Sequence, residues 1–384
     1  MAAPASDLRC LPDGPSDGIT DLRYFTDAND VELLASTSWD GSLRIHNTDK
    51  ATNKLMCQQN MDAGPLLSLS SCPSGKSLFV GGLDGSVRKL DIEKSIVSTI
   101  GYHSSEDMDT DTDMTSTACS CLVSLSFDDE ISTTIVASAG WDSTFYLWDV
   151  ENTNANVDTV AKPIATIKLP DKAFSMDVDP SRGNRIAIAT SGRRLCIIDV
   201  TRTRTISGND ENNDNKYTYE AKMVMDRESS LKYQSRVCRF FPNGVGLAVG
   251  SIEGRVAVEF LNELDVDSNG VKRYAFKCHR AESTVYPVNA IAFHPTFGTF
   301  ATGGCDGGTV TWDGLHKKKL TILPSVPSSV AALAFNGKGN ELAIASSYTF
   351  EEGERGDGMG IGGAGKDEIY VRSMEDVEVQ PKKK

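Results

Sequence analysis

Short runs of β-branched and apolar residues alternate with small or polar residues along the chain, and the runs come in pairs separated by a tight turn. The first clear pair is LLASTSWDGSLRIHN (33–47), in which Asp40-Gly41 separates two apolar stretches. Alternation with a period of two predicts half-buried strands, and Asp-Gly favours a hairpin turn between them. The chain is therefore expected to consist of β-hairpins.

This pattern recurs, which indicates a repeat fold. Asp84 follows Asp40 at a distance of 44 residues, within the period of about 40–45 residues of a WD repeat. Each copy is expected to have a further strand before it, as in 19–25, and another after it, as in 54–59. The copies are 33–47, 78–92, 135–150, 186–200, 247–261, 299–313, and 342–348 continued at 368–374. Four strands in each of seven copies predict an all-β, seven-bladed WD-repeat β-propeller.

Residues 1–384 are expected to form this propeller as a single domain. We expect Asp7–Cys10 to close the ring as the outer strand of the last blade. Three segments lengthen the repeats and are polar, acidic or glycine-rich: 104–117, 207–216 and 351–367. They carry too little apolar surface to offset the entropy lost on ordering, so they are expected to be mobile loops.

Composition narrows the class of protein. The formal net charge is −14, which argues against broad binding to nucleic acid. No apolar run approaches the ~18 residues of a membrane span, and the N-terminus has no apolar region of a signal peptide. Nine cysteines at irregular spacing, without a CxxC pair, predict reduced thiols in the cytosol or nucleus and no zinc site.

Two stretches resemble ligand-binding motifs but lack necessary residues. Gly360–Lys366 has the spacing of a phosphate-binding loop, yet Asp367 stands where Ser or Thr is required. The acidic run 107–113 resembles a calcium loop, but Thr112 replaces its glycine and Ala118 its bidentate glutamate. No pattern organises an acid–base pair either. Neither an enzyme nor a cofactor or metal site is expected.

A local excess of positive charge marks the segment Arg227–Arg255. On a chain of net charge −14, such a segment suits one anionic partner, although solvated loop ends are a common alternative. Tyr233 lies between the cations as a possible stacking partner. The cations are Arg227, Lys232, Arg236, Arg239 and Arg255.

Propeller topology brings part of this set together. Arg236 precedes the first strand of the fifth blade, and Arg255 follows the turn between its second and third strands. Those two positions share one face of a propeller, so both side chains are expected at the same rim. Lys232 and Tyr233 would extend the site, whereas Arg239 lies within the strand and is expected to pack locally.

The four tryptophans fall into two groups. Trp148-Asp149 and Trp312-Asp313 end their strands and are expected to pack between blades. Trp39 and Trp141 occupy turns equivalent to the one before Arg255. They are either partly buried aromatics at a blade edge or anchors exposed on one face, and the shared face favours the second interpretation.

Several segments together resemble a known family. ESSLKYQSR, GSIEGRVAVEF, YAFKCHR, VYPVNAIAFH, TFATGGCDG and LAIASSY are similar to the spindle assembly checkpoint WD-repeat proteins, the third of the "budding uninhibited by benzimidazole" proteins. The likeness runs through most of the chain and is strongest over 227–348. The WD-repeat mRNA-export factors that dock on a nucleoporin share LKYQSR, SIEGRVA and FKCHR, but fit the first two blades less well.

The resemblance implies a non-catalytic adaptor of the nucleus and the mitotic kinetochore, a monomeric propeller working in hetero-complexes. Such proteins bind GLEBS-type segments of the checkpoint kinase and its pseudokinase paralogue, and read phosphorylated Met-Glu-Leu-Thr motifs of a kinetochore scaffold. The implied GLEBS contacts are Trp39, Trp141 and Arg255. The implied phosphothreonine contacts are Arg236, Arg255, Lys232 and Tyr233. How the cations divide between the two ligands stays open, and an mRNA-export or nuclear-pore factor is the alternative.

Overall fold

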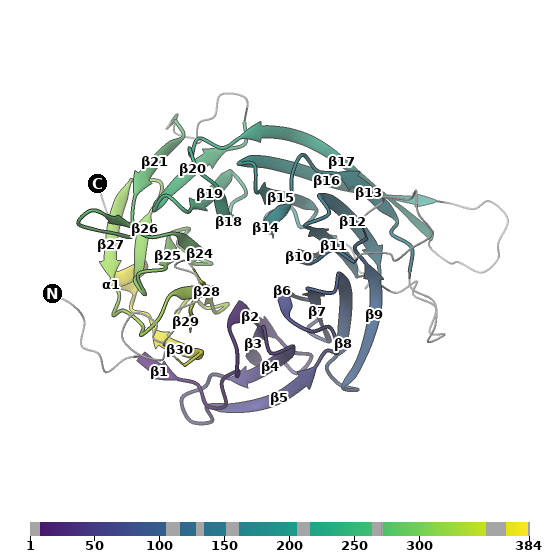
Figure 1. The fold of residues 1–384 in the computed structure, drawn as a ribbon, viewed down its shortest axis with the longest axis horizontal. Helices are drawn as coiled ribbons and strands as arrows, with labels where there is room; N and C mark the ends of the chain where they lie inside the picture. Colours follow the sequence, from purple (N-terminus) through teal and green to yellow (C-terminus); the bar gives the residue numbers. More distant parts are fainter. Residues whose placement is uncertain are drawn as a thin grey trace.

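The chain folds into a ring of seven four-stranded antiparallel sheets around a central channel, as Figure 1 shows. The computed structural model describes residues 8–104, 116–127, 134–150, 161–205, 216–262, 270, 272–350 and 366–382. The predicted seven-bladed propeller is therefore confirmed. Of the three predicted loops, residues 105–115, 207–215 and 351–365 lie outside the described residues, as do the calcium-like run and most of the phosphate-loop-like run.

Each blade is a meander whose first strand lines the channel and whose last strand lies at the circumference. Blade 1 contains β2 (Ile19–Thr26), β3 (Glu32–Ser38), β4 (Ser42–Asn47) and β5 (Lys54–Asn60), and blade 2 contains β6 (Leu66–Ser71), β7 (Ser77–Gly82), β8 (Ser86–Asp91) and β9 (Ile96–Tyr102). Blade 3 contains β10 (Cys119–Leu125), β11 (Ile135–Gly140), β12 (Thr144–Asp149) and β13 (Ala165–Lys168). Blade 4 contains β14 (Ala173–Val178), β15 (Arg185–Thr190), β16 (Arg194–Thr205) and β17 (Lys216–Glu228). Those of blades 5 and 6 are β18 (Ser235–Phe240), β19 (Gly246–Ser251), β20 (Arg255–Phe260) and β21 (Tyr274–Lys277); β24 (Val288–Phe293), β25 (Phe300–Gly304), β26 (Thr309–Asp313) and β27 (Lys318–Ile322). A small hairpin, β22 (Arg280–Ala281) and β23 (Thr284–Val285), links these two blades.

The two ends of the chain close the ring in blade 7. Its strands are β28 (Val330–Phe335), β29 (Glu341–Ser346), β30 (Glu368–Ser373) and β1 (Leu8–Cys10). Strand β1 pairs antiparallel with β30, Leu8 opposite Arg372 and Cys10 opposite Tyr370, so the predicted closing strand pairs as expected. A short helix, α1 (Asp376–Val379), follows β30. There the guanidinium of Arg372 donates to both carboxylate oxygens of Glu378, at 2.8 and 2.7 Å.

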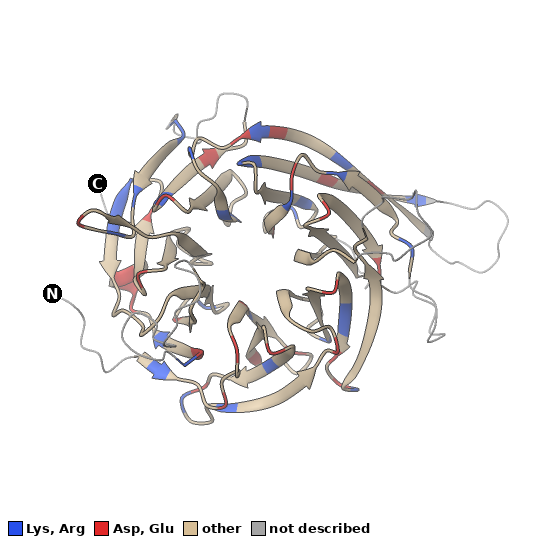
Figure 2. Cartoon of the chain, in the orientation of Figure 1, with Lys and Arg blue, Asp and Glu red and all other residues tan. Residues whose placement is uncertain are grey.

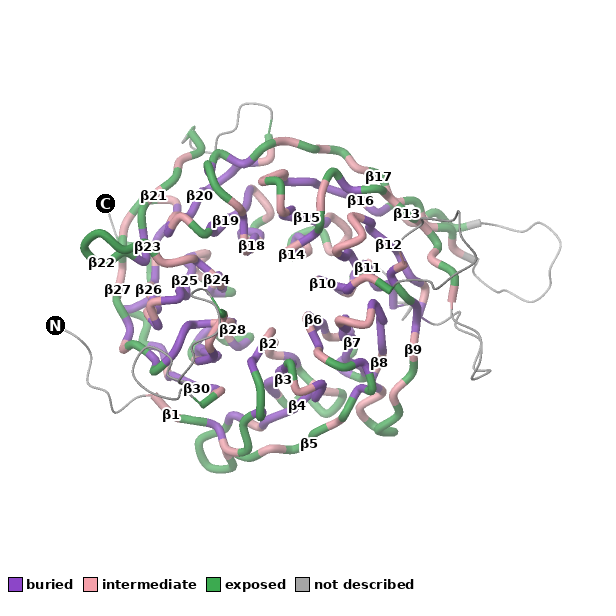
Figure 3. Tube along the Cα trace, in the orientation of Figure 1, coloured by how far each residue is buried: buried purple, intermediate pink, exposed green. Residues whose placement is uncertain are grey.

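Burial follows position in the blade. The second strands are buried along nearly their whole length, because both of their faces pack on neighbouring blades, whereas an outer strand such as β5 alternates exposed and half-buried residues (Figure 3). Trp148 is buried in one apolar cluster with Phe79 and Val87 of blade 2. Trp312 packs against the cluster that joins blades 5 and 6. The two WD dipeptides therefore place their indoles between blades, as predicted.

Two buried polar chains lock these indoles in place. His103 Nδ1 lies 3.0 Å from Asp142 Oδ2, its Nε2 lies 2.8 Å from Ser138 Oγ, and Trp148 Nε1 donates to the same Oγ over 2.8 Å. A second chain repeats this arrangement with Asp306, His279, Thr302 and Trp312.

The first chain has the composition of a hydrolase triad, although no motif in the sequence predicts an acid–base pair. His103 and Ser138 have no exposed surface, and Ser138 already accepts a hydrogen bond from the indole. A substrate cannot reach this hydroxyl. The chain therefore acts as an internal brace of its blade.

None of the nine cysteines forms a disulfide. No helix within the described ranges has the length and apolarity needed to cross a bilayer.

Candidate peptide-binding face

A ring of β-bulges surrounds one mouth of the central channel. In every blade the first strand contains one extra residue near its start, where the register with the second strand shifts. A bulge re-aims the side chain of its extra residue, and all seven of these residues line one cavity at the channel mouth. They are Thr20, Leu67, Ser120, Phe174, Arg236, Asn289 and Ala331.

Arg236 is the single charged member of this ring of seven. Its Nη2 donates a long hydrogen bond of 3.4 Å to Asn289 Oδ1, across the boundary between blades 5 and 6. In Figure 2 most basic and acidic residues lie on turns and outer strands. The bulge thus presents one guanidinium at the centre of the face.

Aromatic side chains share this cavity, whose volume is about 710 Å³. Trp39 is 41% exposed, and its ring packs against Gly18, where an added Cβ would approach the indole to 3.2 Å. Trp141 is half-buried, and its backbone N–H donates to Ala118 O. Tyr348 and Phe350 complete the aromatic lining, with ring centroids 5.1 Å apart. The mouth is therefore an open apolar cavity with one cation at its edge.

The side of the mouth near Trp39 is acidic. Asp17 lines the cavity there, and Asp40 follows Trp39 in the turn. Burial acts to raise the pKa of Asp40, but hydrogen bonds from Ser42 and from the Ser16 backbone, together with Arg44, outweigh it and lower the pKa to about 2. Asp40 is therefore ionised at neutral pH. The cavity has an anionic edge on blade 1 and a cationic edge on blade 5.

The segment that leads into β18 is held by a buried carboxylate. Glu259 on β20 has no exposed surface. Its Oε1 accepts from the backbone N–H and hydroxyl of Ser230, at 2.7 and 2.8 Å, and from Ser229 Oγ at 3.2 Å. Its Oε2 accepts from Arg227 Nη2 at 3.2 Å. Arg227 therefore belongs to this internal support, which fixes the loop at Ser229 and Ser230, seven and six residues before Arg236.

The remaining predicted site residues lie farther out on blade 5. Arg255 begins β20, two strand spacings or about 10 Å from the start of β18, and its Nε lies 3.5 Å from Glu253 Oε2. The backbone N–H of Lys232 donates to Glu253 Oε1. Tyr233 is 58% exposed. Arg236 and Arg255 thus share one face, as topology predicts, but Arg255, Lys232 and Tyr233 do not line the cavity.

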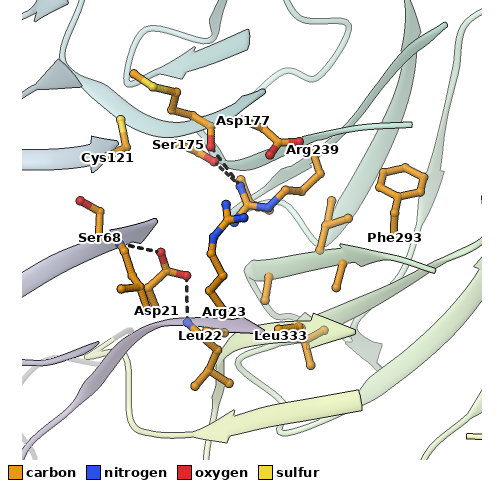
Figure 4. Close-up of a pocket in the computed structure, with 18 of the residues that line it drawn as sticks. Asp21, Leu22, Arg23, Ser68, Cys121, Ser175, Asp177, Arg239, Phe293 and Leu333 are labelled. Atoms are coloured by element: carbon orange, nitrogen blue, oxygen red, sulfur yellow. Dashed lines mark hydrogen bonds between the residues drawn. The ribbon is translucent and has the colours of Figure 1, made fainter. Parts of the chain in front are cut away.

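Arg239 makes the local contacts expected of it. Its Nη1 donates to Ser175 Oγ at 3.1 Å and to Cys238 O at 2.9 Å. It also lines the central channel (Figure 4), as Arg236 does, although the strand pattern predicts opposite sides for the two residues. A regular strand would place residues 236 and 239 on opposite faces; the bulge at Arg236 removes that constraint.

Comparison with known proteins agrees with this geometry. A family model for the WD domain, G-beta repeat, matches residues 7–47 and 270–313. A solved structure of the RRP9 WD40 repeats superposes with a TM-score of 0.69 over 98% of this chain and 99% of that one, at 14% identity, a likeness of fold alone. The closed ring of seven four-stranded sheets and the family match define the class as a WD-repeat β-propeller.

Curated relatives identify the family. Mitotic checkpoint protein BUB3.1 of Arabidopsis thaliana is 36% identical over 98% of this chain and 95% of its own length. Mitotic checkpoint protein bub3 of Dictyostelium discoideum is 35% identical over 89% of each. A Poly(A)+ RNA export protein of Schizosaccharomyces pombe is 30% identical over 88% of this chain and 84% of its own length. The chain belongs to the BUB3 family of mitotic checkpoint WD-repeat proteins.

Proposed function

We propose that this protein is a spindle assembly checkpoint adaptor. It binds GLEBS-type segments of the checkpoint kinase and its pseudokinase paralogue, and recruits them to kinetochores by reading phosphorylated Met-Glu-Leu-Thr motifs. It acts in the nucleus and at the kinetochore in mitosis. The proposal rests on membership of the BUB3 family together with the channel mouth, where a single guanidinium meets an aromatic cavity.

Arg236 is the phosphothreonine contact in this proposal. Phosphorylation adds about −1.5 to −2 charges and three acceptor oxygens, and a guanidinium offers a planar pair of donors that matches them. The other six bulge residues are neutral, so Arg236 is the member of this ring that attracts a phosphate at the mouth. Arg255 is partly neutralised by Glu253 at 3.5 Å, so it attracts an anion less strongly than Arg236; in this proposal it contacts both the phosphate and the carboxylates of a GLEBS-type segment.

Trp39 and Trp141 are the GLEBS contacts. Both line the same cavity as Arg236, and partly exposed indoles beside an apolar cavity are typical anchors of peptide interfaces. Lys232 and Tyr233 lie in the segment before β18, where the backbone of Lys232 bonds to Glu253 of the β19–β20 turn, and they extend the phosphopeptide contact.

A second candidate function is docking on a nucleoporin in mRNA export, favoured by the likeness to the Schizosaccharomyces pombe protein. Affinity capture of the full chain from mitotic cells separates the two. We expect the checkpoint kinase and the phosphorylated scaffold to be recovered with the wild type, and the kinase to be lost with a Trp39→Ala, Trp141→Ala double variant. Recovery of a nucleoporin with RNA, and of neither checkpoint component, would favour the second function.

A further inference from the structure

A second cavity lies between blades 5 and 6 at the circumference of the ring, where β21 and β27 run side by side (Figure 1). This cavity, the β21–β26 cleft, has a volume of about 420 Å³, which is ample for a large side chain. It opens beside the turn that joins β26 to β27. Because successive strands of a blade are antiparallel, this turn lies at the opposite end of the strands from the channel mouth. Among the described residues, none lines both the cleft and the mouth cavity. The side chains that matter here are Tyr274, Phe276, Trp312, Lys277, Lys317 and Lys318.

Three aromatic rings form one wall of the cleft. Tyr274 and Phe276 are two residues apart on β21, so both side chains lie on the same side of the strand. The ring centroid of Phe276 lies 6.2 Å from that of Tyr274 and 4.6 Å from that of Trp312, and all three residues stay half-buried. The Trp312 indole donates to Thr302, and the Tyr274 hydroxyl donates to Gly314 O. The wall is therefore fixed before any ligand arrives, which lowers the entropy cost of binding.

Lysines surround this wall and are not neutralised. The ammonium of Lys317 lies 4.4 Å from the ring centroid of Tyr274, so one cation stands over the aromatic face. Within the described ranges, no carboxylate forms an ion pair with Lys277, Lys317 or Lys318.

The acidic residue of the lining is Asp313, which is buried. Its carboxylate is engaged within its own turn, by the backbone N–H of His316 at 3.0 Å and by His316 Nδ1 at 2.7 Å. Three lysines against this one aspartate leave the lining positive, on a chain that carries −14. The cleft therefore offers an aromatic surface together with cations that lack partners.

We propose that the β21–β26 cleft binds an acidic peptide segment of a partner protein, in which one aromatic or large aliphatic side chain is flanked by Asp or Glu. The apolar side chain packs on the three rings, which still have exposed surface to bury. The flanking carboxylates pair with Lys277 and Lys317, so the two halves of the ligand match the two halves of the cleft. A cationic ligand fits poorly, because Lys317 already occupies the face of Tyr274. A partner held here is carried together with whatever occupies the mouth, and the proposal does not depend on what that is.

The test selects random peptides on the full wild-type chain and, in parallel, on a Lys277→Glu, Lys317→Glu double variant. We expect the peptides enriched only on the wild type to share one large apolar residue with acidic neighbours. One such peptide is then titrated by fluorescence anisotropy, beside versions with its apolar residue changed to Ala or its acids changed to amides. The Ala version should bind about tenfold more weakly or worse, because a buried anchor is lost. The amide version should bind more weakly and lose its dependence on salt.

A Lys50→Glu, Lys54→Glu double variant is the matched control. Lys50 lies in the corresponding turn of blade 1, Lys54 begins its outer strand, and both are exposed. The change in net charge is the same, and neither double variant removes an ion pair of the described residues. We expect the cleft variant to bind the peptide about tenfold more weakly than the control, because reversal replaces attraction with repulsion at two positions.

Equal affinities of the two double variants, or enriched peptides without an acidic and apolar pattern, would overturn the proposal. Displacement of the peptide by a GLEBS-type segment would also overturn it, because binding would then lie at the mouth. Sedimentation of the wild type alone examines the remaining occupant: a concentration-dependent dimer that the cleft variant loses would assign the cleft to a second copy of this chain instead.

Discussion

Replacing Glu259 with glutamine tests whether a buried carboxylate positions the basic segment. The carboxylate accepts four hydrogen bonds, three at Oε1 from Ser229 and Ser230 and one at Oε2 from Arg227. A glutamine amide keeps one acceptor oxygen, which can serve Ser229 and Ser230, but places an NH₂ group against the Arg227 guanidinium. The variant loses one charge-assisted bond, so we expect it to lower the free energy of unfolding by about 1.5–3 kcal/mol.

Glu259→Ala removes all four bonds and leaves a partly buried arginine without this partner, so its cost should rise to about 3–5 kcal/mol. Urea unfolding followed by tryptophan fluorescence measures both changes as shifts of the midpoint at constant slope. Glu220→Gln is the matched control, because Glu220 is exposed on β17. If Glu259→Gln falls within about 0.5 kcal/mol of that control, the size of a neutral surface change, the support role is refuted.

Three further predictions concern the face, the channel and the ring. Trp39→Ala and Trp141→Ala should each weaken binding of a GLEBS-type peptide with little change in melting temperature, whereas misfolded variants would mean that these indoles pack the blades. Asp177 has a raised pKa because it is buried, so ionising it costs the folded state more than the unfolded state. Wild-type stability relative to Asp177→Asn should therefore fall as pH rises from about 4 to 7, and a difference that is constant with pH in chemical denaturation would disprove this. The ring should unfold as one domain, so native proteolysis should cut within 104–117, 207–216 and 351–367 and leave the fragments associated; release of a stable half would contradict it.

The fold could be predicted from sequence because each blade repeats a strong local signal. Alternating apolar residues define the strands, and turns such as Asp84-Gly85 define the hairpins. Closure by β1 followed from the number of strands required, and the burial of Trp148 followed from its place at a strand end.

The candidate site could be predicted only in part. Topology placed Arg236, Arg255, Trp39 and Trp141 on one face, but not around one cavity. A bulge adds a residue without altering the apolar pattern around it. The ring of β-bulges that directs Arg236 into the channel mouth therefore has no signature in the sequence pattern. Glu259 sits in a strand where alternation suggests a solvent-facing residue, and only the fold brings Arg227 and Ser230 to it.

The central claim is that Arg236 reads phosphate at the channel mouth. It is tested most directly by titrating phosphorylated and unmodified Met-Glu-Leu-Thr peptides against the wild type, Arg236→Ala, Arg236→Lys and Arg255→Ala, each with the GLEBS-type segment bound.

We predict that the wild type prefers the phosphorylated peptide by about 10- to 100-fold, from the ~1.5–3 kcal/mol of a charge-assisted contact. Arg236→Ala should remove most of this preference, and Arg236→Lys should restore part of it, because a point charge cannot replace a planar fork. Arg255→Ala, whose arginine is paired with Glu253, should lose less. Equal affinity of the wild type for the two peptides, or an undiminished preference in Arg236→Ala, would contradict the account.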